Sequence, residues 1–342
     1  FTTLVASPDT NPVIDEKTVV KYIETKSRKE SLINILQLGG MTEGLKGIEI
    51  AEIGEMKKAG IVGISDGGTS LKDANLLSNI LKYSIMFDLP VITHCDDMDI
   101  SSTGVMNNGQ VSLELGLKGI SHEAEEIIVA RNVILAKSLG AKIHLSNITT
   151  KGSVNIIRYA KAEGVKITCD TCPHYFTLSE KDVRDYNTLA KVRPPLRTEE
   201  DIESLIEGLF DGTIDMITSG HSPTTIEQKK VEFEKAFYGI SSLETTFLTS
   251  YNCLVEKYKM KFYDFIQKFT IHPANFLNIE GKGKVEEGYE ADLFLFDEKC
   301  DTIIDSSSFA SKAKFSPFNG VEYKGKVLFT IVSGNIMYLQ DY

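Results

Sequence analysis

Short apolar runs alternate with amphipathic stretches along the first 280 residues. The runs are rich in Val, Ile and Leu, end at polar residues, and lie at residues 1–6, 31–38, 60–65, 90–95, 141–146, 165–170 and 214–219. Near-continuous apolar runs of this kind are typical of parallel strands that are buried on both faces. Helical spacing fills the intervals, for example at residues 73–87, 123–139, 154–163 and 199–209. The alternation predicts seven β-α units.

Seven units are one short of a closed (β/α)8 barrel of the TIM type, the α/β fold that this repeat favours. Glycine joints support the pattern, because Gly140 and Gly164 each stand between a helical stretch and the next strand, where a left-handed residue commonly ends a helix. The chain opens at Phe1, inside an apolar run. We therefore expect the first strand of the barrel to precede residue 1.

The pattern changes near the C-terminus. Three helical stretches are expected at residues 242–257, 262–270 and 273–277. Beyond Gly281, short apolar runs at residues 284–288, 291–296 and 325–335 are separated by Gly-containing turns, which indicates strands. We predict a barrel domain over residues 1–280 and a small β-rich domain over residues 281–342.

The amino-acid composition limits the classes of partner and the compartment that we expect for this protein. The 342 residues carry 37 Lys and Arg against 48 Asp and Glu, a net charge of −11, which argues against nucleic acid or an anionic membrane as a partner. The apolar runs fall well short of the roughly 18 residues that a membrane span needs. Five cysteines in a chain of this length, without a signal-peptide pattern, favour a reduced cytoplasmic protein over a disulfide scaffold.

Polar residues follow the predicted strands. In a (β/α) barrel the chemistry lies at the carboxyl ends of the strands. Four of the six histidines fall at four successive strand ends, and Asp66 follows an earlier strand; these histidines are His94, His144, His174 and His221. Such clustering favours a metal site, active or degenerate, although a single histidine at a strand end more often caps the strand or binds a loop carbonyl.

A series of short motifs occurs in a fixed order. They are "TT…SPDTNPVID" from Thr2 to Asp15, "SDGG" at Ser65, "HCDD" at His94, "KVRPPLR" at Lys191, "SGHSPT" at Ser219, "GI..LET" at Gly239 and "G..AD" at Gly288. Together they resemble the dihydroorotases of the amidohydrolase superfamily over essentially the whole chain. The resemblance implies a (β/α) barrel that hydrolyses a cyclic amide in pyrimidine biosynthesis.

The resemblance also implies a zinc centre of one or two ions. Its ligands would be an HxH pair on the first strand, a carboxylate or carboxylated Lys on the fourth, one His each on the fifth and sixth, and an Asp on the eighth that also moves a proton. Asp66 and His94 match two of these positions as remnants. Asn147 stands where the family has a ligand His, and Gly220 stands where it has the catalytic Asp. Two ligands are too few for zinc, so we expect zinc to be absent or weakly bound.

Substrate positions of the family are altered as well. Asp9 replaces an Asn, Arg193 replaces another Asn, and Thr224 replaces a His. A remodelled metal site that uses His144 or His174 stays open, although a structural role for His174 is favoured. Cys169 and Cys172 have zinc-knuckle spacing without a second pair, so core thiols are the better interpretation. The charged stretch at residues 228–235 is expected to be a mobile loop over the barrel mouth or a solvated helix face.

Three hypotheses remain. The first is an active zinc-dependent dihydroorotase with an altered metal site. The second is a non-catalytic homologue that serves as a structural partner of aspartate transcarbamoylase, in a homo- or hetero-oligomer. The third is a hydrolase of another cyclic amide, such as a hydantoin or allantoin. Asn147 and Gly220 favour the second, because hydrolysis needs a hydroxide generator and a proton carrier. On this basis, replacing Gly220 by Asp together with Asn147 by His is expected to move the protein toward metal binding.

Overall fold

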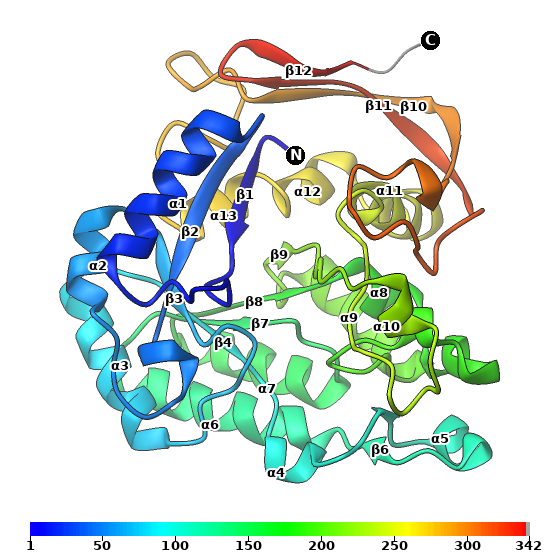
Figure 1. The fold of residues 1–342 in the computed structure, drawn as a ribbon, viewed down its shortest axis with the longest axis horizontal. Coiled ribbons are helices and arrows are strands. Elements are labelled where there is room, and N and C mark those ends of the chain that lie inside the picture. Colours follow the sequence, from blue (N-terminus) through cyan, green and yellow to red (C-terminus); the bar gives the residue numbers. More distant parts are fainter. Residues whose placement is uncertain (340–342) are drawn as a thin grey trace.

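The centre of the molecule is a curled parallel sheet with helices outside it (Figure 1). The computed structural model describes residues 1–339. The strand order is β1-β2-β3-β4-β7-β8-β9, which leaves β1 and β9 at the two edges. The strands of this sheet are β1 (Thr3–Ala6), β2 (Asn34–Gly40), β3 (Gly63–Ser65), β4 (Val91–His94), β7 (Ile143–Ser146), β8 (Ile167–Thr171) and β9 (Met216–Ile217). This is the TIM-type barrel architecture that the repeat predicts, with seven strands in the described chain.

The long helices cover the outer face of the sheet, and shorter helices lie in the loops between the elements. They are α1 (Lys17–Glu30), α2 (Ile53–Ala59), α3 (Ala74–Met86), α4 (Met98–Ser101), α5 (Gln110–Leu115), α6 (Glu123–Leu139), α7 (Lys151–Ala162), α8 (Pro173–Thr177), α9 (Glu199–Asp211), α10 (Ile226–Lys229), α11 (Thr246–Tyr251), α12 (Phe262–Gln267) and α13 (Ile271–Phe276). A further parallel pair, β5 (Met106–Asn107) and β6 (Gly119–Ile120), lies between α4 and α6.

Local sequence sets the ends of the long helices. Asp73 caps α3, accepting hydrogen bonds from the backbone N–H groups of Asn75 and Leu76. Helix α6 ends at Gly140, whose φ of 63° is left-handed. The inner faces of these helices bury apolar side chains, such as Leu77 and Ile80 of α3, against the sheet. The helices therefore cover the sheet with their apolar faces.

The register of the sheet aligns the carboxyl ends of the strands. His94 at the end of β4 pairs with Ser146 at the end of β7. Asp170 and Thr171 of β8 pair with the two residues of β9. Because all of these strands are parallel, the loops that follow them meet at one end of the sheet, which we call the mouth of the barrel.

Several predicted boundaries were wrong. The run at residues 214–219 forms only the two-residue strand β9, and the strand predicted at 284–288 is a turn. The single helix predicted at 242–257 is divided into α11 and a π-helical segment, Asn252–Lys257. Gly, Glu and Lys interrupt the apolar positions at 284–288, so too little apolar surface is available there to hold a strand in place.

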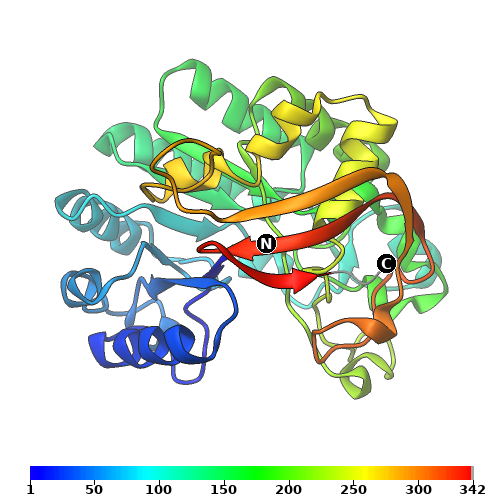
Figure 2. The same cartoon turned by 90° about the horizontal axis from the view of Figure 1, so that it is seen from above.

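The C-terminal part of the chain forms a second sheet. Strands β10 (Leu293–Ile303), β11 (Glu322–Val332) and β12 (Asn335–Leu339) pair antiparallel in that order. They lie across one side of the barrel, close to the N-terminus in both views (Figures 1 and 2). The ring of Phe247 in α11 contacts those of Phe294 and Phe296 in β10 at centroid distances of 5.2 and 5.1 Å. The division at residue 280, like the expected strand before residue 1, stays a prediction.

No helix among residues 1–339 combines the length and the apolar character that crossing a membrane would require.

Candidate functional site

On the β3–β4 side of the mouth, the carboxyl group of Asp66 lies against the backbone of His94. The carboxylate of Asp66 accepts hydrogen bonds from the backbone N–H of His94 at 3.1 and 2.9 Å, and from that of Gly68 at 3.4 Å. Burial raises the pKa of Asp66 to about 8, although these backbone hydrogen bonds oppose the shift. Burial also lowers the pKa of His94. At neutral pH this side of the mouth therefore holds a protonated acid and a neutral imidazole.

Arg193 is paired inside the protein. Its Nε donates to Oδ2 of Asp96 at 2.6 Å, and its guanidinium lies 5.6 Å from the ring centroid of Tyr238. Asp96 follows His94 on the same loop, and its other oxygen accepts from the hydroxyl of Ser101. The positive charge of Arg193 is thus balanced by Asp96, so the guanidinium is committed to a partner within the chain.

The segment at residues 219–241, which we call the strap, crosses the mouth. It leaves the end of β9, and the hydroxyl of Tyr238 donates to the carbonyl of Gly104 at 2.8 Å, in the segment that follows β4 and α4. Since β7 and β8 lie between β4 and β9 in the sheet, the strap passes over their ends.

Two buried lysines fasten the strap. Nζ of Lys229 donates to the carbonyls of Thr188 and Lys191 at 3.1 and 3.0 Å, and Nζ of Lys191 donates in return to those of Phe233 and Glu234 at 2.6 and 3.0 Å. Burial lowers the pKa of each lysine to about 8. The sequence interpretation of residues 228–235 as a mobile loop or a solvated face was wrong for Lys229. The charge pattern of a sequence does not show whether main-chain carbonyls lie close enough to accept hydrogen bonds from a buried ammonium group.

The β7–β9 side is built around Asp170. One oxygen of this carboxylate accepts from Nε2 of His144 at 2.8 Å and from the hydroxyl of Ser146 at 3.0 Å. The other accepts from the backbone N–H of Asn147 at 2.8 Å and from the hydroxyl of Thr218 at 3.0 Å. Burial alone would raise the pKa of Asp170, but these hydrogen bonds, led by that of His144, outweigh it and lower the pKa.

This network fixes the role of His144. Its Nδ1 shares a hydrogen bond of 2.8 Å with the hydroxyl of Thr168, so both ring nitrogens are occupied. The imidazole is 2% exposed and lies 4.5 Å from the ring centroid of Phe276. A metal binds through one ring nitrogen, so recruitment of His144 into a remodelled metal site would have to break one of these two buried hydrogen bonds, and the structure does not support it.

Asn147, at the family's ligand position, bonds to a thiol. Its side-chain oxygen accepts from Sγ of Cys172 at 3.0 Å, and the same sulfur lies 3.3 Å from the hydroxyl of Thr218. Cys172 and Cys169 are fully buried, and burial raises the pKa of both thiols. Cys169 donates to the carbonyl of Thr213. Both cysteines are core thiols, in keeping with the sequence interpretation.

Gly220 lies against Cys172 and His174. A Cβ atom at position 220 would lie 2.7 Å from Sγ of Cys172 and 2.7 Å from Cε1 of His174. His174 is 2% exposed, its Nδ1 has no hydrogen-bond partner among the described residues, and burial lowers its pKa to about 3. The place of the family's Asp side chain is thus occupied by Cys172, the N-cap residue of α8, and by His174 in the first turn of that helix.

The remaining sequence candidates lie at the margin of the mouth. Asp9 is exposed beside Gly67, in the loop after β1. Thr224 lies in the strap, with its hydroxyl buried and unpartnered among the described residues. Nδ1 of His221 accepts from the backbone N–H groups of Ser242 and Leu243, both at 3.2 Å. His221 therefore cannot offer this nitrogen in place of the missing acid.

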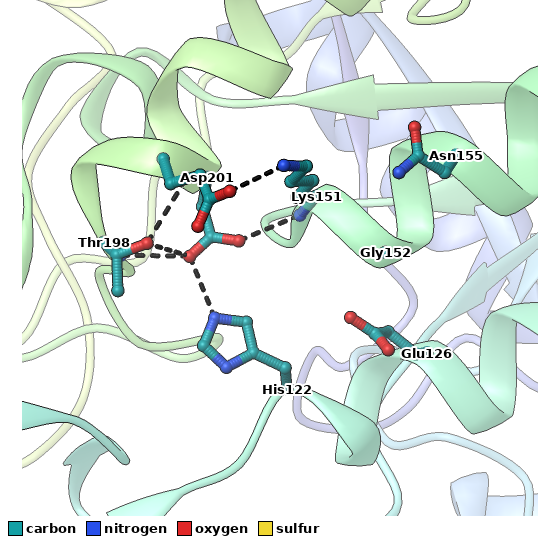
Figure 3. Close-up of a pocket in the computed structure, with 8 residues that line it drawn as sticks. His122, Glu126, Lys151, Gly152, Asn155, Thr198 and Asp201 are labelled. Carbon is teal, nitrogen blue, oxygen red and sulfur yellow. Dashed lines mark hydrogen bonds and ion pairs between the residues drawn. The ribbon is translucent and has the colours of Figure 1, made fainter.

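A separate polar cavity of about 370 Å³ lies outside the mouth, where the N-termini of α6, α7 and α9 meet (Figure 3). His122 points at Asp201, and Nε2 donates to Oδ2 at 2.9 Å. The other oxygen of Asp201 accepts from the backbone N–H of Lys151, and Thr198 donates to Oδ2 through its N–H and its hydroxyl. The carboxylate at these helix ends is thus supplied by the chain itself, and we interpret the cavity as a structural joint.

Solved structures share the fold of this chain. The chain superposes on L-hydantoinase (dihydropyrimidinase) from Arthrobacter aurescens with a TM-score of 0.87 at 23% identity, covering 98% of this chain and 77% of that one. D-hydantoinase from Thermus sp. gives 0.83 at 18% identity, covering 100% and 78%. Likeness at such identity shows the fold alone.

Sequence relatives define the family more narrowly. A family model described as dihydro-orotase-like matches residues 1–153. The chain is 46% identical over 341 residues to the dihydroorotase of Thermoanaerobacter sp. (strain X514), covering 100% of this chain and 79% of the relative. It is 44% identical over 337 residues to that of Acetivibrio thermocellus, covering 98% and 79%. The chain belongs to the dihydroorotase family.

Members of these families are generally metal-dependent, so the donor set is the test of fit. Within residues 1–339, no three side chains of His, Cys, Asp or Glu are grouped so that they could hold a metal ion. Asp66 and His94 supply at most two ligands, whereas zinc takes three or four. The amide of Asn147 is bonded to a thiol, and Gly220 has no donor. The described residues do not fit a family zinc centre.

Sequence reasoning missed the residue at the centre of the β7–β9 network. Asp170 ends an apolar run, so it was read as the end of a strand. A charged residue within a run that is otherwise buried is a signal of a paired carboxylate, because a lone buried charge is too costly. That signal was present, but its four donors could not be identified without the strand register.

Proposed function

We propose that this chain is a non-catalytic member of the dihydroorotase family that acts in de novo pyrimidine biosynthesis as a structural partner of aspartate transcarbamoylase. The observation that carries the proposal is the state of the mouth at Asn147 and Gly220. At the first position the family's ligand is replaced by an amide that accepts from Cys172. At the second, the proton carrier is replaced by a glycine with no room for a side chain.

Proton transfer supports the non-catalytic assignment. Hydrolysis of a cyclic amide moves a proton from the attacking water to the leaving nitrogen, and a positioned general acid–base contributes about 10²–10⁴-fold to such reactions. His221 is held by the backbone of residues 242 and 243, and the carboxylate of Asp170 already accepts four hydrogen bonds. Neither Nδ1 of His221 nor the carboxylate of Asp170 is therefore free to take over the role of the missing Asp.

The partner follows from the family resemblance. Some members of this family, inactive ones included, associate with aspartate transcarbamoylase, the class of enzyme that forms the carbamoyl aspartate on which dihydroorotases act. The chain also retains its folded barrel and a net charge of −11, which offers a stable acidic surface for association. An assembly with that enzyme is therefore the first complex to test.

The test combines turnover with co-purification. The natural full-length protein should hydrolyse dihydroorotate far below about 10 per second, a median rate for enzymes. It should also co-elute with aspartate transcarbamoylase of the same organism in size-exclusion chromatography. Turnover near the median rate with one or two zinc ions per chain would replace the proposal by its alternative.

That alternative is an active dihydroorotase with an altered metal site. The retention of Asp66 and His94 at two of the family's ligand positions favours it. It requires ligands beyond the described residues. Metal analysis of the natural full-length protein, beside the turnover assay, separates the two functions.

A further inference from the structure

The two replaced family positions share an unusual backbone. Asn147 has a φ of 60° and Gly220 a φ of 56°, both in the left-handed region. Glycine enters this region freely and asparagine enters it more readily than most residues, whereas other side chains are strained there. The backbone itself, and not only the side chain, therefore suits the present residues at these positions.

Position 220 is also closed by its neighbours. Contacts between non-bonded carbon atoms are favourable at about 3.5–4.0 Å. A Cβ at 220 would lie 2.7 Å from Sγ of Cys172, 2.7 Å from Cε1 of His174, and 3.3 Å from Cβ of Cys172. Any side chain at 220 must push the thiol and the imidazole away at once.

Neither neighbour has an easy way to move. The thiol of Cys172 is bonded to Asn147 and lies beside the hydroxyl of Thr218, with no exposed surface. His174 lies in the first turn of α8, is almost fully buried, and has its ring centroid 4.1 Å from that of Tyr175. Moving either side chain would break a buried hydrogen bond or a packed ring contact.

We propose that Cys172 and His174 lock position 220 in its side-chain-free state, so that restoring the family's Asp and His does not by itself restore a metal site. This inference rests on the proposed function for its biological meaning, but its physical content is the packing at 220. It also corrects the expectation that Gly220→Asp with Asn147→His moves the chain toward metal binding. Because of this crowding, we expect Gly220→Asp with Asn147→His to destabilise the fold without adding a metal ligand.

A matched pair of alanine variants tests the lock. Gly140 has a φ of 63°, close to that of Gly220, but a Cβ at 140 meets nothing within 4 Å. Gly140→Ala therefore measures the backbone strain alone, and Gly220→Ala measures strain plus crowding. The melting temperature of the full chain should fall several degrees further for Gly220→Ala. Equal shifts in the two variants would overturn the proposal, and failure of only Gly220→Ala to fold would support it.

Relief of the crowding provides the second arm. In a double-mutant cycle, Cys172→Ala should reduce the loss caused by Gly220→Ala, because it removes the nearer atom of that residue. Zinc content after incubation with zinc alone should stay near background in Gly220→Asp/Asn147→His, which should also melt earlier than the parent. One tightly bound zinc per chain in that double variant, with an unchanged melting temperature, would refute the lock. Turnover by the natural protein would instead refute the proposed function and leave the packing comparison valid.

Discussion

Two carboxylates lie at the same end of one sheet, Asp66 after β3 and Asp170 in β8, and each is 3% exposed. At neutral pH, Asp66 is protonated and Asp170 is ionised. The pKa of Asp66 is raised to about 8, whereas that of Asp170 is lowered. Burial acts on both in the same direction, so the difference comes from the groups around them.

The partners explain the difference. Among residues 1–339, Asp66 accepts from backbone N–H groups alone, at both oxygens from His94 and at a longer distance from Gly68. Asp170 accepts from an imidazole, two hydroxyls and a backbone N–H. Hydrogen bonds to the ionised form stabilise it against burial. The comparison teaches that the β7–β9 side is a complete hydrogen-bonded unit, whereas the β3–β4 side is an acid with few donors.

The largest effect is expected from Asp170→Asn. An amide at 170 has one acceptor oxygen, so its NH₂ group must face donors that now meet the second carboxylate oxygen. Leaving a buried donor without its acceptor costs about 1–3 kcal/mol for each donor, and more where the lost acceptor is charged. Urea unfolding monitored by circular dichroism measures the loss. As a control, Ser146→Ala removes one donor only and should cost about 1 kcal/mol. An Asp170→Asn protein as stable as the parent would contradict the network.

Asp66→Asn should have a smaller effect of the opposite sign. Because the pKa of Asp66 is raised in the folded protein, its contribution to stability is full below about pH 4 and is lost as pH rises through about 8. Asparagine keeps an acceptor for His94 and cannot ionise. The variant should therefore match the parent at pH 4 and exceed it at pH 9 by about 1–3 kcal/mol, the usual cost of an unsatisfied buried group.

The measurement is the free energy of unfolding of both proteins in urea across pH 4–9. Asp99→Asn is the control, since Asp99 is an exposed acid that pairs with Lys72 on the surface. Its stability should run parallel to that of the parent across the range. If Asp66→Asn shows the same pH slope as the parent, Asp66 is not the acid described here.

The smallest effect is expected at the helix joint of Figure 3, where a third carboxylate extends the comparison. Hydrogen bonds from His122, Thr198 and Lys151 overcome the burial of Asp201 and lower its pKa to about 2. The hydrogen bond between His122 and Asp201 also raises the pKa of His122. The stabilisation is therefore present below about pH 6.5 and is lost as pH rises through the folded pKa of His122.

The variant His122→Gln can still donate to Asp201 but carries no charge. It should lower stability by about 0.2–1 kcal/mol at pH 5.5 and by less at pH 8. A direct check is the titration of the imidazole protons of His122 by NMR. A midpoint at or below 6.5 would show that Asp201 does not favour the charged imidazole. Because Asp201 stays ionised from about pH 4 upward, it does not contribute to the slope in this range.

Several local features followed from sequence because short-range physics controls them. Helix α6 spans Glu123–Leu139 as predicted, since Gly140 supplies the left-handed end. The seven strands were all identified from their apolar runs. Predicted strand boundaries were wrong where pairing with a neighbouring strand sets the length of a strand. Strand β9, for example, is limited to the two residues that pair with Asp170 and Thr171. The burial of Lys229 also depended on carbonyls of a segment about 40 residues away.

The amino-acid sequence by itself determined the alternation of strands and helices, the family, and the absence of a functional side chain at position 220. Only the tertiary structure decided that this absence is enforced. The register of β8 beside β7 and β9 brings four donors to Asp170 and carries Cys172 and His174 up to Gly220. Such contacts join residues that lie 20 to 50 positions apart, and no local pattern encodes which of them will meet. The sequence shows which atoms were lost, and the packing shows what took their place.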